Sequence, residues 1–153
     1  MRRCPKLAGA TFSMTSDLDT FLLQARAQLT RLDPEAASDA IQHGAILVDT
    51  RPEFQRRADG EIPGAIVVER NHLEWRLHPA SPGRIPEAVD VDVRWIVICD
   101  EGFASSLAAA TLQEIGLRRA TDVIGGFQAW RSARLPVAFP AVLTPPRRAP
   151  TDA

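Results

Sequence analysis

The sequence predicts an α/β fold in which a parallel sheet is covered by helices on both faces. Short apolar runs without polar alternation predict strands at residues 45–48, 65–68 and 95–98, and such runs are typical of parallel strands buried on both faces. Segments with helical spacing or helix-capping signals separate the runs, which favours right-handed strand–helix–strand crossovers. Reactive side chains are therefore expected at the carboxyl ends of the strands.

Two helices are predicted before the first strand. Helical spacing of apolar side chains favours an amphipathic helix over residues 18–32. Its apolar positions are Leu18, Phe21, Leu22, Ala25 and Leu29. A second helix is expected over residues 34–43, because Asp33 is a capping residue, Pro34 suits the first helical position and Gly44 stops the helix.

The rest of the chain alternates between strands and short helices. Glycines at 116 and 125–126 end or connect elements, and prolines leave residues 71–86 irregular apart from one short helix. In chain order, the elements expected after the strand at 45–48 are a polar helix or turn at 53–58, the strand at 65–68, a helix at 73–77, the strand at 95–98, a helix at 105–115, a strand at 120–124 and a helix at 127–133.

Length and composition narrow the class of protein. The 153 residues fit one domain with an ordinary core, and a net charge of −1 favours neither nucleic acid nor a membrane surface as a partner. No apolar run approaches the roughly 20 residues of a membrane span. Two cysteines, Cys4 and Cys99, do not make a disulfide framework and fit a reducing compartment, so the cytoplasm is the expected location. His72 and His78 lack the spacing of metal ligands, and no metal site is predicted.

Three regions are expected along the chain. Residues 1–16 show no periodic pattern and are predicted to form a disordered leader, within which Met14 is an alternative start of the protein. Residues 17–137 are predicted to form a single domain. Residues 138–153 are rich in proline and arginine and are predicted to be a flexible tail.

Cys99 is the candidate nucleophile. It follows the predicted strand at 95–98, and a short loop containing Gly102 leads from it to the helix at 105–115. Backbone N–H groups converge at such a turn, and the helix N-terminus adds partial positive charge, so both effects favour the thiolate. A second interpretation remains open, because free cysteines are commonly small buried hydrophobes.

Four motifs along the chain carry a resemblance to a known family. They are Val48-Asp49-Thr50-Arg51 with Glu53 and Phe54, then Ile62-Pro63-Gly64-Ala65, then Ile98-Cys99 with Gly102 and Ser105, and finally Gly125-Gly126-Phe127-Gln128-Ala129-Trp130. In this order and at this spacing they resemble the rhodanese homology family over about residues 34–137, with the helix at 18–32 as an N-terminal addition.

The resemblance implies a fold and an activity. The fold would be a single three-layer α/β/α rhodanese-like domain with a parallel sheet of about five strands. Cys99 would accept sulfane sulfur, become a persulfide, and pass the sulfur to cyanide, a small thiol or a protein thiol, without cofactor or metal. Asp49 and Arg51 would support the loops. The substrate-binding loop would consist of Asp100, Glu101, Gly102, Phe103, Ala104 and Ser105, with the amides of residues 101–105 stabilising the anionic sulfur.

The loop after Cys99 favours sulfur over phosphate. Six residues, 100–105, separate the cysteine from Ser106, which in sulfur-transferring members makes a tight cradle of N–H groups. Cysteine phosphatases need an arginine at the sixth position after the cysteine to grip phosphate through two parallel hydrogen bonds. This position is Ser105, so phosphatase chemistry is disfavoured.

The same loop is acidic, whereas members of the family that use thiosulfate commonly carry basic residues in it. Asp100 and Glu101 each oppose ionisation of Cys99 by on the order of 1 kcal/mol, while the helix terminus returns roughly 0.3–2 kcal/mol. We therefore expect Cys99 to carry a persulfide but to use thiosulfate poorly. Two alternatives stay open: both carboxylates point to solvent, or the chain is a non-catalytic rhodanese-homology module for partner binding or redox sensing.

Four further side chains have expected roles. A structural salt bridge is favoured over substrate contact for Arg51. Arg70 follows the strand at 65–68, either as an anion partner that faces the Cys99 side of the sheet or as a solvent-facing residue. Ser105 and Ser106 are expected to cap the following helix.

Overall fold

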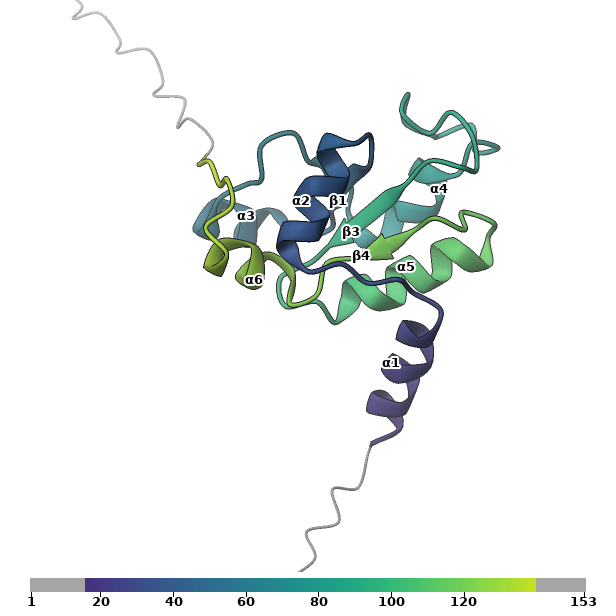
Figure 1. Ribbon diagram of the computed structural model, residues 1–153. Coiled ribbons are helices and arrows are strands. Elements are labelled where there is room, and N and C mark those ends of the chain that lie inside the picture. Colours follow the sequence, from purple (N-terminus) through teal and green to yellow (C-terminus); the bar gives the residue numbers. More distant parts are fainter. Residues whose placement is uncertain (1–15, 140–153) are drawn as a thin grey trace, which may run out of the picture.

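A computed structural model describes residues 16–139 and contains a parallel sheet with helices on both sides (Figure 1). Cys4, Met14 and nearly all of the predicted leader and tail lie outside these residues. The elements are α1 (Asp17–Ala27), α2 (Pro34–Gln42), β1 (Ile46–Asp49), α3 (Glu53–Asp59), β2 (Ile66–Val67), the 3-10 turn η1 (Arg70–His72), α4 (Leu73–Leu77), β3 (Trp95–Ile98), α5 (Ala104–Glu114), β4 (Thr121–Asp122) and α6 (Gly126–Ser132).

The sheet has four parallel strands in the order β2-β1-β3-β4, not the expected five. The edge beyond β4 is reduced to one parallel bridge between Leu32 and Val123. The Leu32 amide donates to the carbonyl of Asp122 at 3.1 Å, and its carbonyl accepts from the Ile124 amide at 2.8 Å. Pairing stops there because Asp33 caps α2 directly afterwards through the amide of Ala36.

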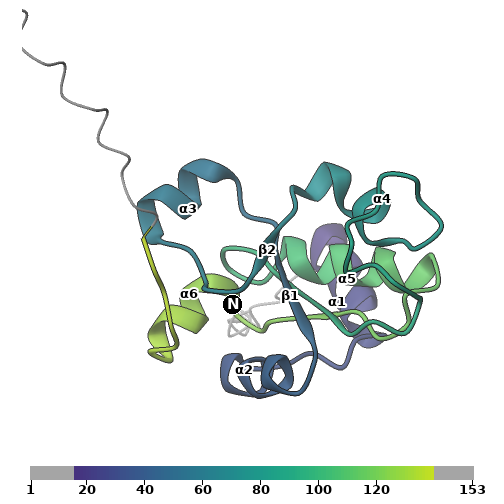
Figure 2. The ribbon, with the colours of Figure 1, turned by 90° about the horizontal axis from the view of Figure 1, so that it is seen from above.

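Alternate strand residues face two separate cores. Val48, Trp95 and Val97 pack against α4 and α5, whereas Leu47 and Ile96 pack against α2 and α6. Figure 2 shows α2 and α5 on opposite sides of β1. All residues of β3 are buried, which is the burial that its unbroken apolar run predicts.

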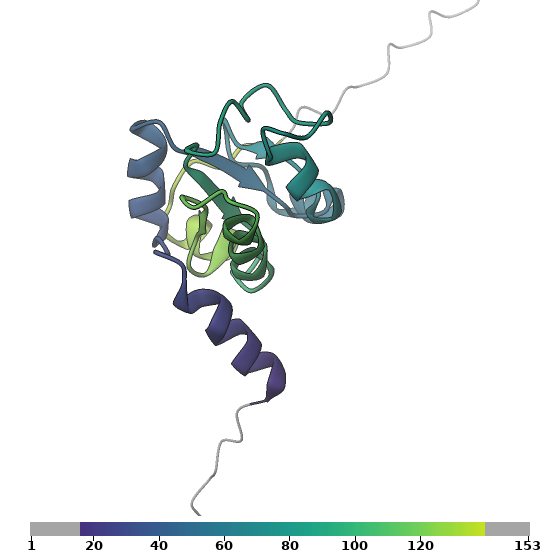
Figure 3. The same ribbon diagram turned by 90° about the vertical axis from the view of Figure 1, so that its right-hand side faces the viewer.

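Helix α1 is shorter than the sequence pattern predicts. It starts with a capping box between Ser16 and Asp19 but ends at Ala27 instead of residue 32. Its last turns pack on α5 through the buried Ala25, while Phe21 nearer its start is 58% exposed. Figure 3 shows the purple first half of α1 extending away from the sheet. Among the described residues, none of the helices has the length and apolar character needed to cross a membrane.

Candidate functional site

Cys99 lies at the carboxyl end of β3, where the chain turns into the loop before α5. Its side chain is buried, with 8% of the residue exposed. The amides of Gly102 and Ser105 approach its Sγ at 3.2 and 3.3 Å. Two of the amides predicted for residues 101–105 therefore contact the sulfur, and both present N–H groups that stabilise an anion there.

A glycine turn after β4 presses against this loop. Gly102 has a φ of +85°, and a Cβ on it would lie 2.8 Å from the amide nitrogen of Gly125. Gly126 has a φ of +60°, and a Cβ there would lie 2.6 Å from the carbonyl oxygen of Cys99. The amide of Phe127 donates to the same carbonyl at 2.8 Å. The glycines are required because the two backbones touch without room for side chains.

The carboxylate of Asp122 lies behind the loop and was not predicted as a site residue. It is fully buried and accepts hydrogen bonds at 2.8 Å from the hydroxyls of both Ser105 and Ser106. The prediction that these serines cap α5 was wrong, because α5 starts at Ala104 without a side-chain cap. The serine hydroxyls donate to the buried carboxylate instead of accepting from amides at the start of the helix, because hydrogen bonds to an ionised acceptor are the stronger ones. The sequence signal was a carboxylate inside an apolar strand, which demands buried partners.

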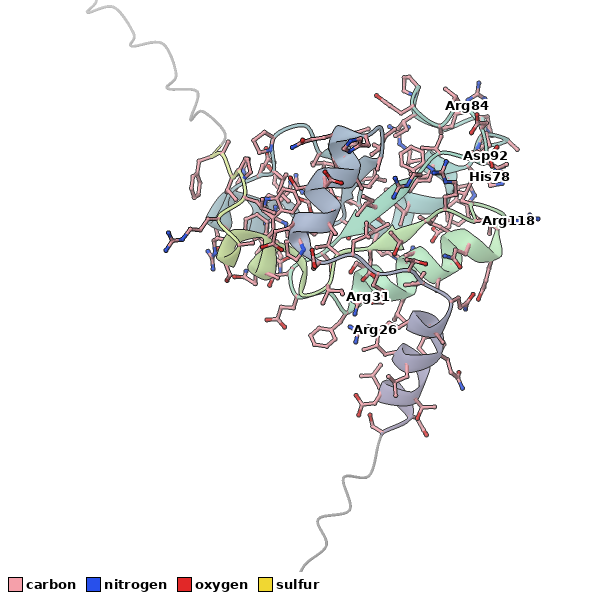
Figure 4. The ribbon with its side chains drawn as sticks, viewed as in Figure 1. Arg26, Arg31, His78, Arg84, Asp92 and Arg118 are labelled. Atoms are coloured by element: carbon pink, nitrogen blue, oxygen red, sulfur yellow. The ribbon has the colours of Figure 1, made fainter. Side chains whose placement is uncertain are left out.

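Two arginines from the chain before α2 contact Asp122 and the loop after Cys99, and neither was predicted as a site residue. Arg31 pairs with Asp122, with Nε at 2.8 Å from one carboxylate oxygen and Nη2 at 3.1 Å from the other. Arg26 donates from Nη2 to the carbonyl of Gly102 at 2.8 Å and from Nε to the Ser106 hydroxyl at 3.0 Å. Figure 4 shows both side chains together near the start of α5. Burial lowers the pKa of the Arg26 guanidinium, Arg31 lowers it further, and Asp122 opposes both.

Asp49 and Arg51 form a buried ion pair at the end of β1. The two side chains are 1% and 0% exposed, and Nη2 of Arg51 lies 2.7 Å from the carboxylate. Nη2 also donates to the carbonyl of Gly60 at 2.9 Å, and the guanidinium stacks 3.7 Å from the centroid of the Phe127 ring. The predicted structural salt bridge of Arg51 is confirmed. It joins β1 to the loop before β2 and to α6.

A pocket of about 410 Å³ opens beside Cys99. Phe103 and Pro52 give it apolar walls, and Arg70 lines it as well. Arg70 is 41% exposed and pairs with Glu74, so the structure brings it to the cysteine side of the sheet, as one of its two predicted alternatives required. A positive side chain thus shares a pocket with the thiol.

Asp100 and Glu101 also line this pocket, but they differ in exposure and hydrogen bonding. The carboxylate of Asp100 is half-buried and accepts a hydrogen bond from Nε2 of Gln128 at 2.8 Å, whereas Glu101 is exposed. The backbone N–H of Gln128 also donates to the backbone carbonyl of Asp100 at 3.0 Å. The alternative that both carboxylates point to solvent therefore holds for Glu101 but not for Asp100, which is half-buried and hydrogen-bonded. Within residues 16–139, no group of three or more potential metal-binding side chains is clustered.

Known proteins share this sequence pattern. The sequence profile of the rhodanese-like domain matches residues 33–133. The thiosulfate sulfurtransferase GlpE of Actinobacillus succinogenes is 35% identical over 109 residues, which cover 71% of this chain and 89% of that protein. The GlpE protein of Haemophilus influenzae is 33% identical over 107 residues, which cover 69% of this chain and 91% of that protein.

Solved structures share the fold. A Rhodopseudomonas palustris protein of unknown function, described as a possible tyrosine phosphatase, has a TM-score of 0.72 and 30% identity, covering 84% of this chain and 99% of its own. The polysulfide-sulfur transferase homodimer of Wolinella succinogenes has a TM-score of 0.65 and 23% identity, covering 80% of this chain and 87% of its own. The second similarity is one of fold alone.

Gly126→Ala is expected to lower the free energy of unfolding by about 2–4 kcal/mol, because a Cβ would strain a left-handed residue and collide with the Cys99 carbonyl. Gly116→Ala is the matched control, since Gly116 has a φ of +98° but a Cβ added there would meet nothing within 4 Å. The control should cost about 1 kcal/mol. Urea denaturation measures both, and equal losses would contradict the close approach.

Asp122→Asn is expected to lower the free energy of unfolding by about 3 kcal/mol, because it removes the buried partner of Arg31, whose side chain is only 14% exposed and loses its ion pair. The control is Glu53→Gln, which breaks an ion pair with Arg57 whose side chains are 62% and 73% exposed. This control should change stability by less than about 0.5 kcal/mol. A loss for Asp122→Asn as small as that of the control would show that the carboxylate does not hold the loop.

Proposed function

Because this chain belongs to the rhodanese-like domain family, we propose that it is a sulfurtransferase that carries sulfane sulfur as a persulfide on Cys99. The observation that carries the proposal is the pair of amides, from Gly102 and Ser105, that approach Sγ at 3.2 and 3.3 Å. These donors belong to the backbone, so they are in place before any substrate arrives. A preformed set of donors stabilises negative sulfur without reorganisation during the reaction.

The proposed reaction has two displacements. The Cys99 thiolate attacks the outer sulfur of a donor, forms an S–S bond, and breaks the bond between that sulfur and the rest of the donor. With thiosulfate the leaving group is sulfite; with an organic persulfide it is a thiolate. In the second step cyanide or an acceptor thiolate attacks the outer sulfur of the Cys99 persulfide. The products are thiocyanate or a new persulfide, and the thiolate of Cys99 is regenerated.

The charged side chains that line the pocket affect which sulfur donor can approach Cys99. Thiosulfate carries two negative charges and meets Asp100 and Glu101, which line the pocket beside Cys99. Arg70 lines the same pocket and offsets part of this repulsion, but it is paired with Glu74. Repulsion scales with the charge of the donor. We therefore propose that persulfide donors with one negative charge are used better than thiosulfate.

Phosphatase activity is the rival suggested by the Rhodopseudomonas palustris protein described as a possible tyrosine phosphatase. The loop of this chain has Ser105 where a cysteine phosphatase needs an arginine. The nearby guanidiniums of Arg26 and Arg31 both donate to the carbonyl of Gly102, on the back of the loop. They are not among the residues that line the pocket. The guanidinium groups that do line the pocket, those of Arg51 and Arg70, are paired with Asp49 and Glu74. This arrangement supports sulfur transfer over phosphate hydrolysis.

Incubation with thiosulfate or 3-mercaptopyruvate, or with an organic persulfide, is expected to add the mass of one sulfur atom to the intact protein. Cyanide should remove the added sulfur and yield thiocyanate, because nucleophilic attack on the outer sulfur restores the thiolate. Cys99→Ala is the control and should gain no sulfur at this site. If no donor adds sulfur to the wild-type protein, the chain is a non-catalytic module for partner binding or redox sensing.

Glu101→Lys is expected to raise kcat/KM for thiosulfate by about tenfold at low salt, since it exchanges a repulsive charge for an attractive one at the pocket. A persulfide donor with one negative charge should gain only about threefold. Glu114→Lys makes the same exchange at an exposed position at the far end of α5 and should change neither value. Equal gains for both variants would show a general effect of net charge and not a local one.

A further inference from the structure

We propose that Arg26 is a positioning residue that, together with Arg31, holds the Gly102–Phe103 peptide with its N–H directed to the sulfur side of the loop and places positive charge behind Cys99. This inference rests on the proposed function, because it names what prepares the loop for an anionic sulfur. Neither arginine lies within residues 33–133, the stretch that matches the rhodanese-like domain. The device therefore belongs to the N-terminal addition of this chain.

The carbonyl of Gly102 is held by both guanidinium groups. Nη2 of Arg26 donates to it at 2.8 Å and Nη2 of Arg31 at 3.2 Å. Hydrogen bonds from a charged donor are roughly twice as strong as neutral ones. Two of them on one carbonyl fix the orientation of its peptide plane, and the Asp122 carboxylate in turn fixes Arg31.

The orientation of this carbonyl determines where the next amide points. A trans peptide is planar, with its C=O and N–H directed to opposite sides, and the protein has no cis peptide among residues 16–139. Because the Gly102 carbonyl faces the arginines, the N–H of Phe103 faces away from them. The amide of Gly102 itself donates to Sγ of Cys99. The Phe103 amide is thus turned to serve as a further donor once an outer sulfur is attached.

The charge behind the loop is positive. Arg26 and Arg31 carry two positive charges and Asp122 one negative charge, which leaves a net charge of +1 in this group. Arg31 is neutralised by Asp122, but no carboxylate of the described residues forms an ion pair with Arg26. Burial lowers the pKa of the Arg26 guanidinium and the charge of Arg31 lowers it further, whereas Asp122 and Cys99 act in the opposite direction. The free charge of Arg26 therefore acts on the sulfur from the side opposite to Asp100 and Glu101.

Packing keeps Arg26 in place. Its guanidinium lies 5.8 Å from the centroid of the Phe103 ring, and its Nε donates to the hydroxyl of Ser106 at 3.0 Å. The residue sits in the last turn of α1, beside the buried Ala25 that packs on α5. Docking of α1 on α5 thus delivers the guanidinium to the loop.

The test compares the full-length wild-type protein with Arg26→Gln, Arg26→Lys and Arg118→Gln. Iodoacetamide alkylation of Cys99 is followed against pH, because it reports the thiolate without needing a sulfur donor. Arg26→Gln should shift the midpoint of this profile upward by on the order of half a pH unit. Arg26→Lys keeps the charge, so its midpoint should stay close to that of the wild-type protein. Arg118 is exposed, lines the pocket beyond the far end of α5 and should have no effect.

A second readout follows the Phe103 amide by NMR across the same pH range. The wild-type amide signal should move as the thiolate forms, and the movement should be smaller in Arg26→Gln, because the peptide then loses one of the two guanidinium groups that hold it. Thermal melting identifies any variant that fails to fold. If Arg26→Gln does not fold, Arg26→Lys takes its place: lysine keeps the charge but not the fork of donors, so the alkylation midpoint should stay near that of the wild type while the Phe103 response falls, and an unchanged Phe103 response would overturn the inference. An unchanged midpoint and an unchanged Phe103 response in folded Arg26→Gln would overturn the inference. If alkylation shifts as expected but no donor loads Cys99, the proposed function fails while this inference stands.

Discussion

The buried carboxylate of Asp122 is the constraint that organises the site. It has no exposed surface, so its charge must be matched inside the protein. It obtains that match from the hydroxyls of Ser105 and Ser106 and from Arg31. These partners come from the start of α5 and from the segment before α2. One ionised group therefore fixes the loop after Cys99 against both β4 and the N-terminal part of the chain.

Charge of opposite sign lies on the two sides of Cys99. Asp100 and Glu101 line the open pocket in front of the sulfur, where Arg70 is paired with Glu74, while Arg26 reaches the back of the loop without an ion-pair partner among the described residues. In the proposed function, the positive charge behind would favour a thiolate or persulfide, and the carboxylates in front would disfavour dianionic donors. Under the proposed function, such a site would hold an anionic sulfur and discriminate among the anions that deliver it. The acidic loop is thus compatible with transfer chemistry.

Local patterns in the sequence predicted most of the fold but little of what lies behind the loop. The strand Trp95–Ile98 was predicted with its observed bounds, because an unbroken apolar run is itself the signal of burial on both faces. The helix predicted at 18–32 was too long, since Leu29 packs on one core from the irregular segment that follows α1 and keeps helical spacing only by coincidence. The contacts of Arg31 with Asp122 span 91 positions, and such pairing leaves no local pattern.

A crystal structure of the protein after loading with a sulfane-sulfur donor would decide whether Cys99 carries sulfur in the cradle of loop amides. We expect a second sulfur atom bonded to Sγ of Cys99, on the pocket side, within hydrogen-bonding distance of the loop amides that include Phe103 N–H. Arg26 should remain on the carbonyl of Gly102. An unmodified Cys99 after loading with every donor, or an added sulfur turned away from the loop amides, would refute this mechanism.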